Sequence, residues 1–172
     1  MLSEVTAAVA SLAASGEAIR ALASDLSPES ARWKPAPDRW SILEVVNHLA
    51  DEESEDFRAR LDLLLHRPAE AFAPIDPQGW VVSRDYSGRD LEESVARFAR
   101  ERRKSLDWLR GLDSPALDHT RRHPSAGVLS GRQMLASWVA HDLLHVRQIT
   151  RLRYQHLAAT HGFEAIAYAG DW

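Results

Sequence analysis

The stretch Trp138–Gln148, WVAHDLLHVRQ, contains two histidines four positions apart, His141 and His145. Apolar residues recur around them at the three- and four-residue spacing of an amphipathic helix, which we expect to run from residue 130 to about residue 156. On such a helix both imidazoles lie on one face, one turn apart. Two side chains so placed can bind one metal ion, but two histidines do not fill its coordination shell. A third ligand has to come from elsewhere in the chain.

The composition limits the kinds of protein and site. The chain has 172 residues, of which 45% are hydrophobic and 27% charged, as in an ordinary globular protein, and a single domain over residues 1–172 is the simplest expectation. With no cysteine, thiolate metal sites, disulfides and cysteine nucleophiles are excluded. A net charge of -4 argues against nucleic-acid binding. We expect no leader peptide, no apolar run of membrane-spanning length and a cytoplasmic location.

Three further segments have helical spacing of apolar residues, at 2–26, 41–67 and 90–111. Capping-box patterns begin two of the four helices, with Ser41 and Glu44 at one and Ser130 and Gln133 at the other. Proline-bearing connections separate the segments, and no strand is predicted, although Val81-Val82 would suit a short extended piece. The pattern predicts an all-α protein, a four-helix bundle. Long connections allow a crossover, so simple up-down order is not assumed.

His48 is the candidate for the third ligand. It lies on the apolar stripe of the helix at 41–67, as His141 and His145 lie on the stripe of theirs. The interior of a helical bundle assembles metal sites from facing helices in this way. Three imidazoles leave at least one position of a divalent ion open, which is typical of a catalytic site. The alternative is three core histidines that each find a hydrogen bond.

At these residues the chain resembles the DinB-like superfamily of metal-binding four-helix bundles. The matching residues are Trp40-Ser41-Ile42, His48-Leu49-Ala50-Asp51, His123, Gly127, Leu129, Trp138-Val139-Ala140-His141-Asp142, His145 and Gln148-Ile149. The resemblance implies a bundle of the DinB-like type with an unusual helix order. It also implies a divalent metal, commonly nickel or zinc, on His48, His141 and His145, and frequent homodimers. Characterised relatives include thiol-dependent isomerases and transferases.

The resemblance and the open metal position lead to three hypotheses about function. The first is a metal-dependent thiol S-transferase, in which the thiolate of a low-molecular-weight thiol attacks a small electrophile. The second is a metal-dependent hydrolase, in which the same position activates water. The third is a non-catalytic metal-binding stress-response protein. The sequence does not decide whether the protein is an enzyme.

Two acidic residues one turn beyond His48 are candidates for a role in the site. Glu52 can face the metal as a catalytic base, whereas Glu53 is rotated farther round the helix. The alternative for both is a solvated acidic run, since the stretch 51–56 holds five carboxylates. Acidic residues of this helix are also candidates to accept the second N–H of a metal-bound histidine.

Three more residues have two interpretations each. Arg102 is interpreted as a snorkelling arginine at the edge of its helix, with a buried anion-binding arginine as the alternative. His123 lies in a Pro/Gly loop and is interpreted as a surface residue, with a place at the mouth of the site as the alternative. Asp142 is turned about 100° from its neighbour His141, so we expect it to be exposed or paired across helices.

Overall fold

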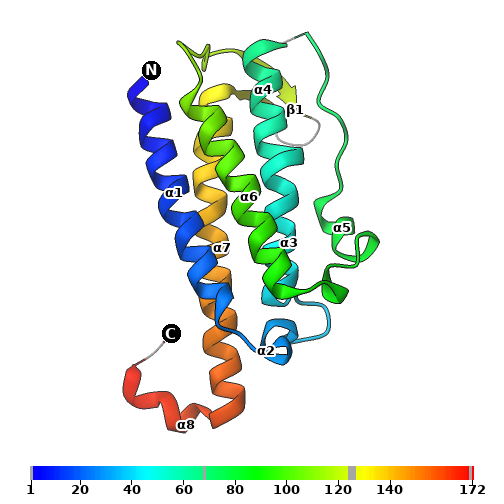
Figure 1. Cartoon of the computed structure of the whole chain (residues 1–172), viewed down its shortest axis with the longest axis vertical. Coiled ribbons are helices and arrows are strands. Elements are labelled where there is room, and N and C mark those ends of the chain that lie inside the picture. Colours follow the sequence, from blue (N-terminus) through cyan, green and yellow to red (C-terminus); the bar gives the residue numbers. More distant parts are fainter. Residues whose placement is uncertain (1, 68, 124–126, 171) are drawn as a thin grey trace.

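The computed structural model describes residues 2–67, 69–123, 127–170 and 172, and it shows a four-helix bundle (Figure 1). The first long helix is α1 (Leu2–Ser24). The second is continuous through α3 (Ile42–Glu52), a π-helical turn η1 (Glu53–Phe57) and α4 (Arg58–His66). The third and fourth are α6 (Leu91–Arg110) and α7 (Gly131–His161). The predicted all-α bundle is confirmed, with boundaries close to those expected.

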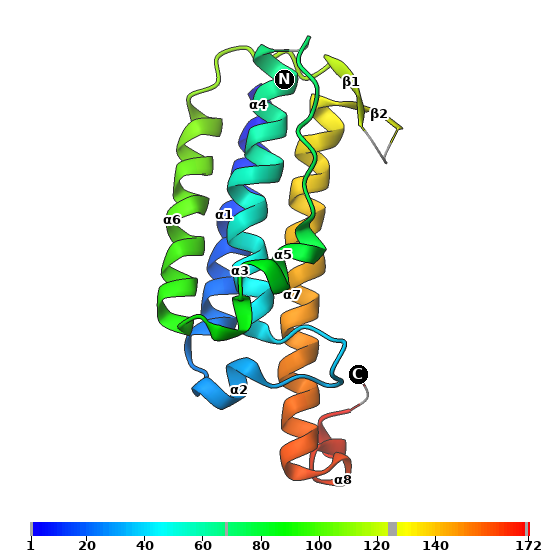
Figure 2. The ribbon, with the colours of Figure 1, turned by 90° about the vertical axis from the view of Figure 1, so that its right-hand side faces the viewer.

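The helices do not follow one another around the bundle as simple hairpins would place them. α1 packs against α6 and α7, and α3 packs against α6 while α4 packs against α7, so α1 and the α3–α4 helix lie diagonally. In Figures 1 and 2, α1 and α7 run downward whereas α3–α4 and α6 run upward. The connection between α4 and α6 therefore returns along the length of the bundle. This order makes α3 and α7 neighbours, which the metal site requires.

The connections contain more regular structure than the sequence predicted. α2 (Pro28–Arg32) follows α1, and α5 (Pro77–Ser83) with the 3-10 turn η2 (Tyr86–Gly88) precedes α6. The expectation of an extended piece at Val81-Val82 is wrong, because both valines lie in α5. Pro77 at the first turn and the Asp76 side chain, which accepts a hydrogen bond from the Gly79 amide, start this helix.

The prediction of no strands is also wrong for the connection between α6 and α7. There β1 (Thr120–His123) and β2 (Gly127–Ser130) form an antiparallel hairpin, with Thr120 opposite Ser130 and His123 opposite Gly127. The four residues of β1, TRRH, include no apolar side chain, and those of β2, GVLS, include two adjacent ones, so neither strand shows the alternating apolar pattern that predicts a strand. Figure 2 shows the hairpin at the same end of the bundle as α4.

Both predicted capping boxes are present. The Ser41 side chain accepts from the Glu44 amide at 3.3 Å and the Glu44 carboxylate accepts from the Ser41 amide at 2.7 Å. Ser130 and Gln133 make the equivalent pair at the start of α7. α7 runs beyond residue 156 to His161 and ends at Gly162, whose φ of 84° favours glycine. α8 (Phe163–Ile166) and η3 (Ala167–Ala169) are the last helical elements of the described chain.

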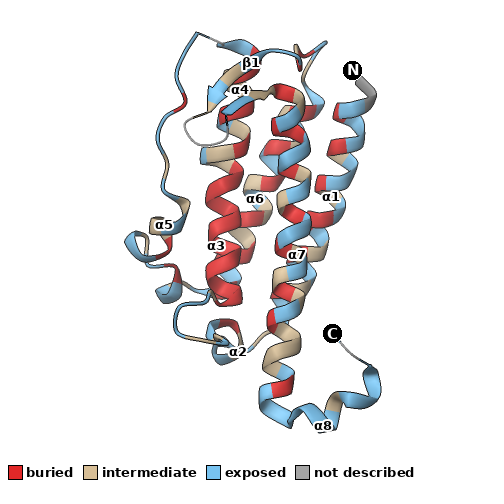
Figure 3. Ribbon diagram, turned by 180° about the vertical axis from the view of Figure 1, so that it is seen from behind, coloured by how far each residue is buried: buried red, intermediate tan, exposed pale blue. Residues whose placement is uncertain are grey.

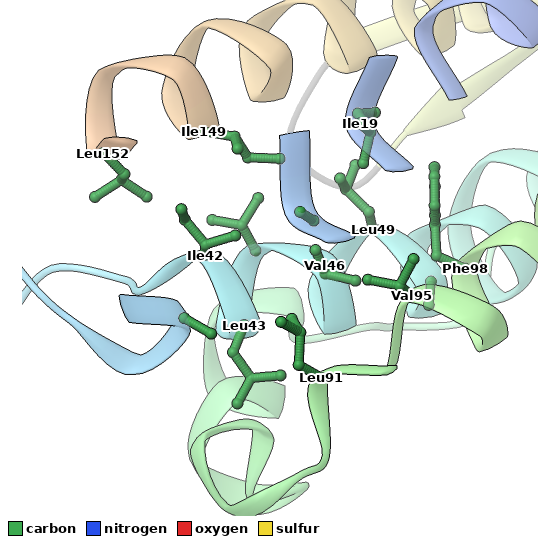
Figure 4. Packing of buried hydrophobic residues seen from close by; sticks show 14 residues of the cluster. Ile19, Ile42, Leu43, Val46, Leu49, Leu91, Val95, Phe98, Ile149 and Leu152 are labelled. Carbon is green, nitrogen blue, oxygen red and sulfur yellow. The ribbon is translucent and has the colours of Figure 1, made fainter. Parts of the chain in front are cut away.

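The core is divided into two clusters along the bundle, and every residue of α3 is buried (Figure 3). The first cluster, seen in Figure 4, joins α1, α3, α6 and α7 through residues such as Ile19, Leu49 and Ile149. The second surrounds Trp138 and includes Leu12. Each large apolar side chain buried here contributes about 1.5–3 kcal/mol.

Within α1, the segment Glu4–Ser24 has 21 residues and a mean hydropathy of 1.2, so by length and composition alone it is long and apolar enough to span a membrane. The expectation that no apolar run approaches that length is therefore corrected. The core helix of a bundle meets the same criterion, and Leu12 and Ile19 of this segment are fully buried between the helices.

Candidate metal centre

The structure brings the three predicted histidines together in the bundle interior. His48 comes from α3, and His141 and His145 come from α7. One ligand nitrogen of each ring lies within 4.8 Å of the others, and the Nε2 atoms of His141 and His145 are 3.1 Å apart. His48 is 4% exposed and its Nδ1 is buried without a hydrogen bond among the described residues. Three converging neutral nitrogens fit a divalent transition-metal ion.

Neighbouring side chains fix the orientation of each ring. His145 Nδ1 lies 2.8 Å from Gln148 Oε1, and an amide oxygen can only accept, so this nitrogen carries the proton and Nε2 keeps its lone pair toward His141. The Trp40 ring lies 4.8 Å from His48, between centroids, and the Phe57 ring 4.9 Å from His141. No role was predicted for Gln148, although its three-residue spacing from His145 on one helix was available as a signal.

Burial sets the charge of the site. Desolvation is the largest cause that lowers the pKa of His48 and of His141 to about 3, and it also lowers the pKa of His145. The neighbouring imidazoles add to the effect on His48 and His141. All three rings are therefore neutral at pH 7 and present lone pairs that a metal can accept without displacing protons.

We expect the metal-free protein to lose stability as the pH falls below about 6.5. His48 and His141 have a pKa of 6.5 as model groups and about 3 in the folded chain, so between these values the unfolded chain binds protons that the folded chain does not. The free energy of unfolding is therefore unaffected by these two rings above about pH 6.5 and decreases as the pH falls from 6.5 toward 3. Urea unfolding of chelator-treated protein at pH 7.5, 6 and 5 measures this loss. In the double variant His48→Asn, His141→Asn the free energy of unfolding should depend less steeply on pH. The same dependence in the variant and the wild type would contradict the assignment of the effect to these two histidines.

Glu52 lies beside the histidines. Its Oε2 is 3.3 Å from His141 Nε2, and the side chain is buried. Burial is the main cause that raises the pKa of Glu52 to about 8, with Asp56 adding and Arg60 opposing. The interpretation of a wholly solvated acidic run is wrong, because Glu53 is buried as well and only Glu55 is exposed among the acidic residues from 51 to 56. The π-helical turn η1 begins directly after Glu52, and such turns are frequent at functional sites.

Arg102 is the clearest correction to the sequence interpretation. It is 4% exposed rather than snorkelling, and all five of its N–H groups have partners. Two bonds of 2.8 and 2.9 Å reach the Glu53 carboxylate, two of 2.5 and 2.8 Å reach Asp142, and one of 2.6 Å reaches the Leu12 carbonyl. Despite desolvation, these carboxylates raise the pKa of Arg102, while burial raises that of Glu53.

In this buried arginine cluster, the two carboxylates that bind Arg102 are sequence neighbours of residues in the metal centre. Glu53 follows Glu52, and Asp142 follows His141. Asp142 is therefore a partner across helices, as one of its two interpretations predicted. Trp138 donates from its indole nitrogen to Glu53 at 3.2 Å. The cluster thus ties α1, η1, α6 and α7 together at the level of the histidines.

His123 does not line the site in the part of the chain that the structure describes. It lies in β1, where its ring contacts the Arg60 guanidinium and lies 5.5 Å from the Phe72 ring, between centroids. Arg60 in turn pairs with Asp56 at 2.9 Å. His123 is half-buried rather than a freely exposed loop residue.

A pocket of about 510 Å³ opens onto the three histidines. Glu52 and Gln148 line it, and its outer walls come from the connection before α3 and from the first turn of α5. The remaining lining residues are Asp38, Arg39, Trp40, Pro77 and Gln78. The centre therefore has both an open side for water or substrate and a buried carboxylate beside it.

Comparison with known families matches residues 11–149 to the model of the DinB superfamily. The chain belongs to the DinB superfamily. This confirms the resemblance drawn from the sequence motifs, and with the histidine cluster it makes the chain a DinB metal-binding protein with a three-histidine site.

Two relatives place this DinB chain among proteins of known name. One, from Oceanobacillus iheyensis, is named "Putative metal-dependent hydrolase OB0782" and is 26% identical over 113 residues, covering 66% of this chain and 64% of the relative. The chain thus spans somewhat less than two thirds of that relative's length. The solved structure of YfiT from Bacillus subtilis matches with a TM-score of 0.78 at 20% identity, over 88% of this chain and 87% of YfiT.

The likeness to YfiT shows the fold. YfiT is described as a probable metal-dependent hydrolase with an unusual four-helix bundle topology. The diagonal placement of α1 and α3–α4 in this DinB chain is likewise not the order of consecutive hairpins.

Proposed function

We propose that this DinB protein is a metal-dependent hydrolase of a small molecule, with a divalent ion, zinc or nickel, held by His48, His141 and His145. The observation that carries the proposal is the open pocket in which three neutral imidazoles and one buried carboxylate, Glu52, converge. Of the two reactions predicted from the sequence, hydrolysis is the one that the names of the two relatives support. Thiol S-transfer with a low-molecular-weight thiol stays a prediction, as does a homodimer.

A divalent ion on three imidazoles would supply a Lewis acid that activates water at neutral pH. The protein's own groups do the rest. Gln148 holds His145 in the tautomer whose Nε2 is free for the ion. Glu52 stands beside His141 on the pocket wall, where its carboxylate can accept a proton from water and return it to the leaving group. A cation nearby favours the ionised form of Glu52 and so counteracts the burial that raises its pKa.

Glu52→Gln is expected to lower kcat by about 10²- to 10⁴-fold, the usual contribution of a general base, while the protein keeps its metal. The amide preserves the shape of the side chain but cannot accept a proton from water. Steady-state hydrolysis and metal content of the variant, measured on the same preparation, check the role. Glu55→Gln, a change at an exposed carboxylate three residues on, is the control. If Glu52→Gln loses the metal as well, Glu52 is a ligand rather than a base.

The proposed reaction is tested with purified protein loaded separately with Zn²⁺ and Ni²⁺. Ester and amide substrates are offered with and without bacterial low-molecular-weight thiols, and the products are identified by mass spectrometry. Hydrolysis predicts release of the free acid without any thiol. Products that carry the thiol and form only in its presence would favour the S-transferase. Absence of turnover with every pair would favour the non-catalytic metal-binding protein.

A further inference from the structure

A second pocket, of about 400 Å³, adjoins the metal centre and shares three lining residues with it: Arg39, Trp40 and Gln148. Its other walls come from the loop at Pro35 and from the next two turns of α7. Leu152 gives it an apolar floor, since this side chain is 5% exposed and belongs to the core. We name the two pockets together the groove. It runs from the histidines along α7.

The charge of the groove changes along its length. Carboxylates line it only at the metal end, where Glu52 and Asp38 lie. The far pocket is lined by two guanidinium groups, Arg39 and Arg151, and by no carboxylate among the described residues. Arg39 pairs with Asp38 only loosely, at 3.8 Å with both side chains mostly exposed. In the described chain, Arg151 makes no ion pair.

Helix geometry gives the distance between the two ends. Arg151 follows His145 by six positions, which at 1.5 Å per residue is about 9 Å along α7. A small molecule with one end at the metal would thus place its other end between the two arginines. Guanidinium groups bind carboxylate and phosphate in two-point contacts. Arg39 and Arg151 are both exposed on the wall of the far pocket, so their guanidinium groups can reach such an anion.

We propose that the far pocket is an anion subsite and that the substrate carries a carboxylate or phosphate at the end remote from the reacting bond. Arg39 and Arg151 bind this anionic group, Trp40 and Leu152 contact the apolar part between the ends, and the histidine end holds the group that reacts. Arg39 and Arg151 are then specificity-determining residues. The inference rests on the proposed function, which leaves the substrate unnamed.

Calorimetric titration of the zinc-loaded protein tests the subsite without turnover. The probes are straight dicarboxylates from succinate to suberate, each compared with the monocarboxylate of the same carbon number, and the matching ω-phosphonocarboxylates. We expect one chain length at which the second anionic group tightens binding about tenfold. Whichever of the dicarboxylate and the phosphonocarboxylate binds more tightly at that length shows whether the subsite prefers a carboxylate or a phosphate group. Equal affinity for dicarboxylate, phosphonocarboxylate and monocarboxylate at every length would overturn the proposal.

Variants separate the subsite from general surface charge. Arg151→Gln and Arg39→Gln should each remove most of that preference, so that the dicarboxylate binds nearly as weakly as the monocarboxylate of the same length. Arg147→Gln is the matched control, because it makes the same charge change on the same helix at an exposed residue outside the groove. Asp38→Asn should strengthen the preference by freeing Arg39. A loss in Arg147→Gln equal to that in Arg151→Gln would overturn the subsite.

The same proteins, assayed with a neutral ester and an ester bearing a remote carboxylate, keep the two proposals apart. An anion preference in binding with no hydrolysis of either ester would refute the proposed function and leave the subsite standing. Hydrolysis of both esters at equal kcat/KM, with no anion preference in binding, would refute the subsite and leave the proposed function standing.

Discussion

His48→Ala is expected to abolish stoichiometric metal binding, with affinity for Zn²⁺ or Ni²⁺ reduced by about 10³-fold or more. Two α7 ligands would remain, and two imidazoles leave the coordination shell too open to retain a divalent ion against water and buffer. His141→Ala and His145→Ala should have the same effect, because each supplies one of the three converging nitrogens. Metal content after desalting, and competition with a chromophoric chelator, measure the loss.

The same variants should lose the stabilisation that the metal gives the wild type. Binding to the folded state alone adds about 4 kcal/mol when free metal is 1,000 times its dissociation constant. Thermal unfolding with and without metal should thus shift for the wild type and not for the variants. His161→Ala is the control, since that histidine is exposed at the end of α7. Retention of one metal per chain by all three triad variants would place the metal elsewhere.

Arg102→Met is expected to destabilise the protein by about 3–5 kcal/mol, the usual result of removing one partner from a buried ionic network. Methionine fits the space but leaves Glu53 and Asp142, 2% and 1% exposed, without their cation. Urea unfolding of metal-free wild type and variant at pH 7 measures the difference. Arg103→Met, at the next and exposed position of α6, is the control and should change stability by less than about 0.5 kcal/mol.

The pH dependence of this loss identifies its cause. Burial already raises the pKa of Glu53 against the opposing effect of Arg102, and without the arginine that pKa rises further. A carboxyl whose pKa is raised by folding contributes stability at low pH that is lost as the pH rises through its folded value. The difference between wild type and Arg102→Met should therefore shrink as the pH falls. A difference independent of pH would indicate lost packing alone.

The metal ligands were predictable because helical spacing determines which side chains face inward. His48, His141 and His145 lie on the apolar stripes of two helices, and any close-packed bundle directs those stripes toward one interior. The capping boxes at Ser41 and Ser130 depend only on residues three apart, so they too could be read directly. Short-range rules of this kind need no knowledge of which helix packs against which.

The parts that were missed depend on long-range packing. Arg102 is buried because Glu53 and Asp142 arrive from two other helices, and no pattern around residue 102 shows where they lie. The close approach of α1 to α6 also depends on long-range packing. A Cβ on Gly16 would lie 3.2 Å from Arg102 Cγ, so a larger residue at this position of α1 would require the Arg102 side chain to shift. The hairpin before α7 was not predictable from apolar alternation, because neither TRRH nor GVLS has that pattern.

The diagonal helix order also bears on how the chain folds. His48 and His141 are 93 positions apart in the sequence, so a metal bound to both closes a long loop, as a disulfide would. Closing such a loop costs entropy before the imidazoles can meet. The packing of α3 and α7 with α1 and α6 has to supply the free energy that offsets this cost. The unfolded chain thus offers no preformed chelate. Metal binding should follow the assembly of the bundle and then act as a reversible cross-link between the two halves of the chain.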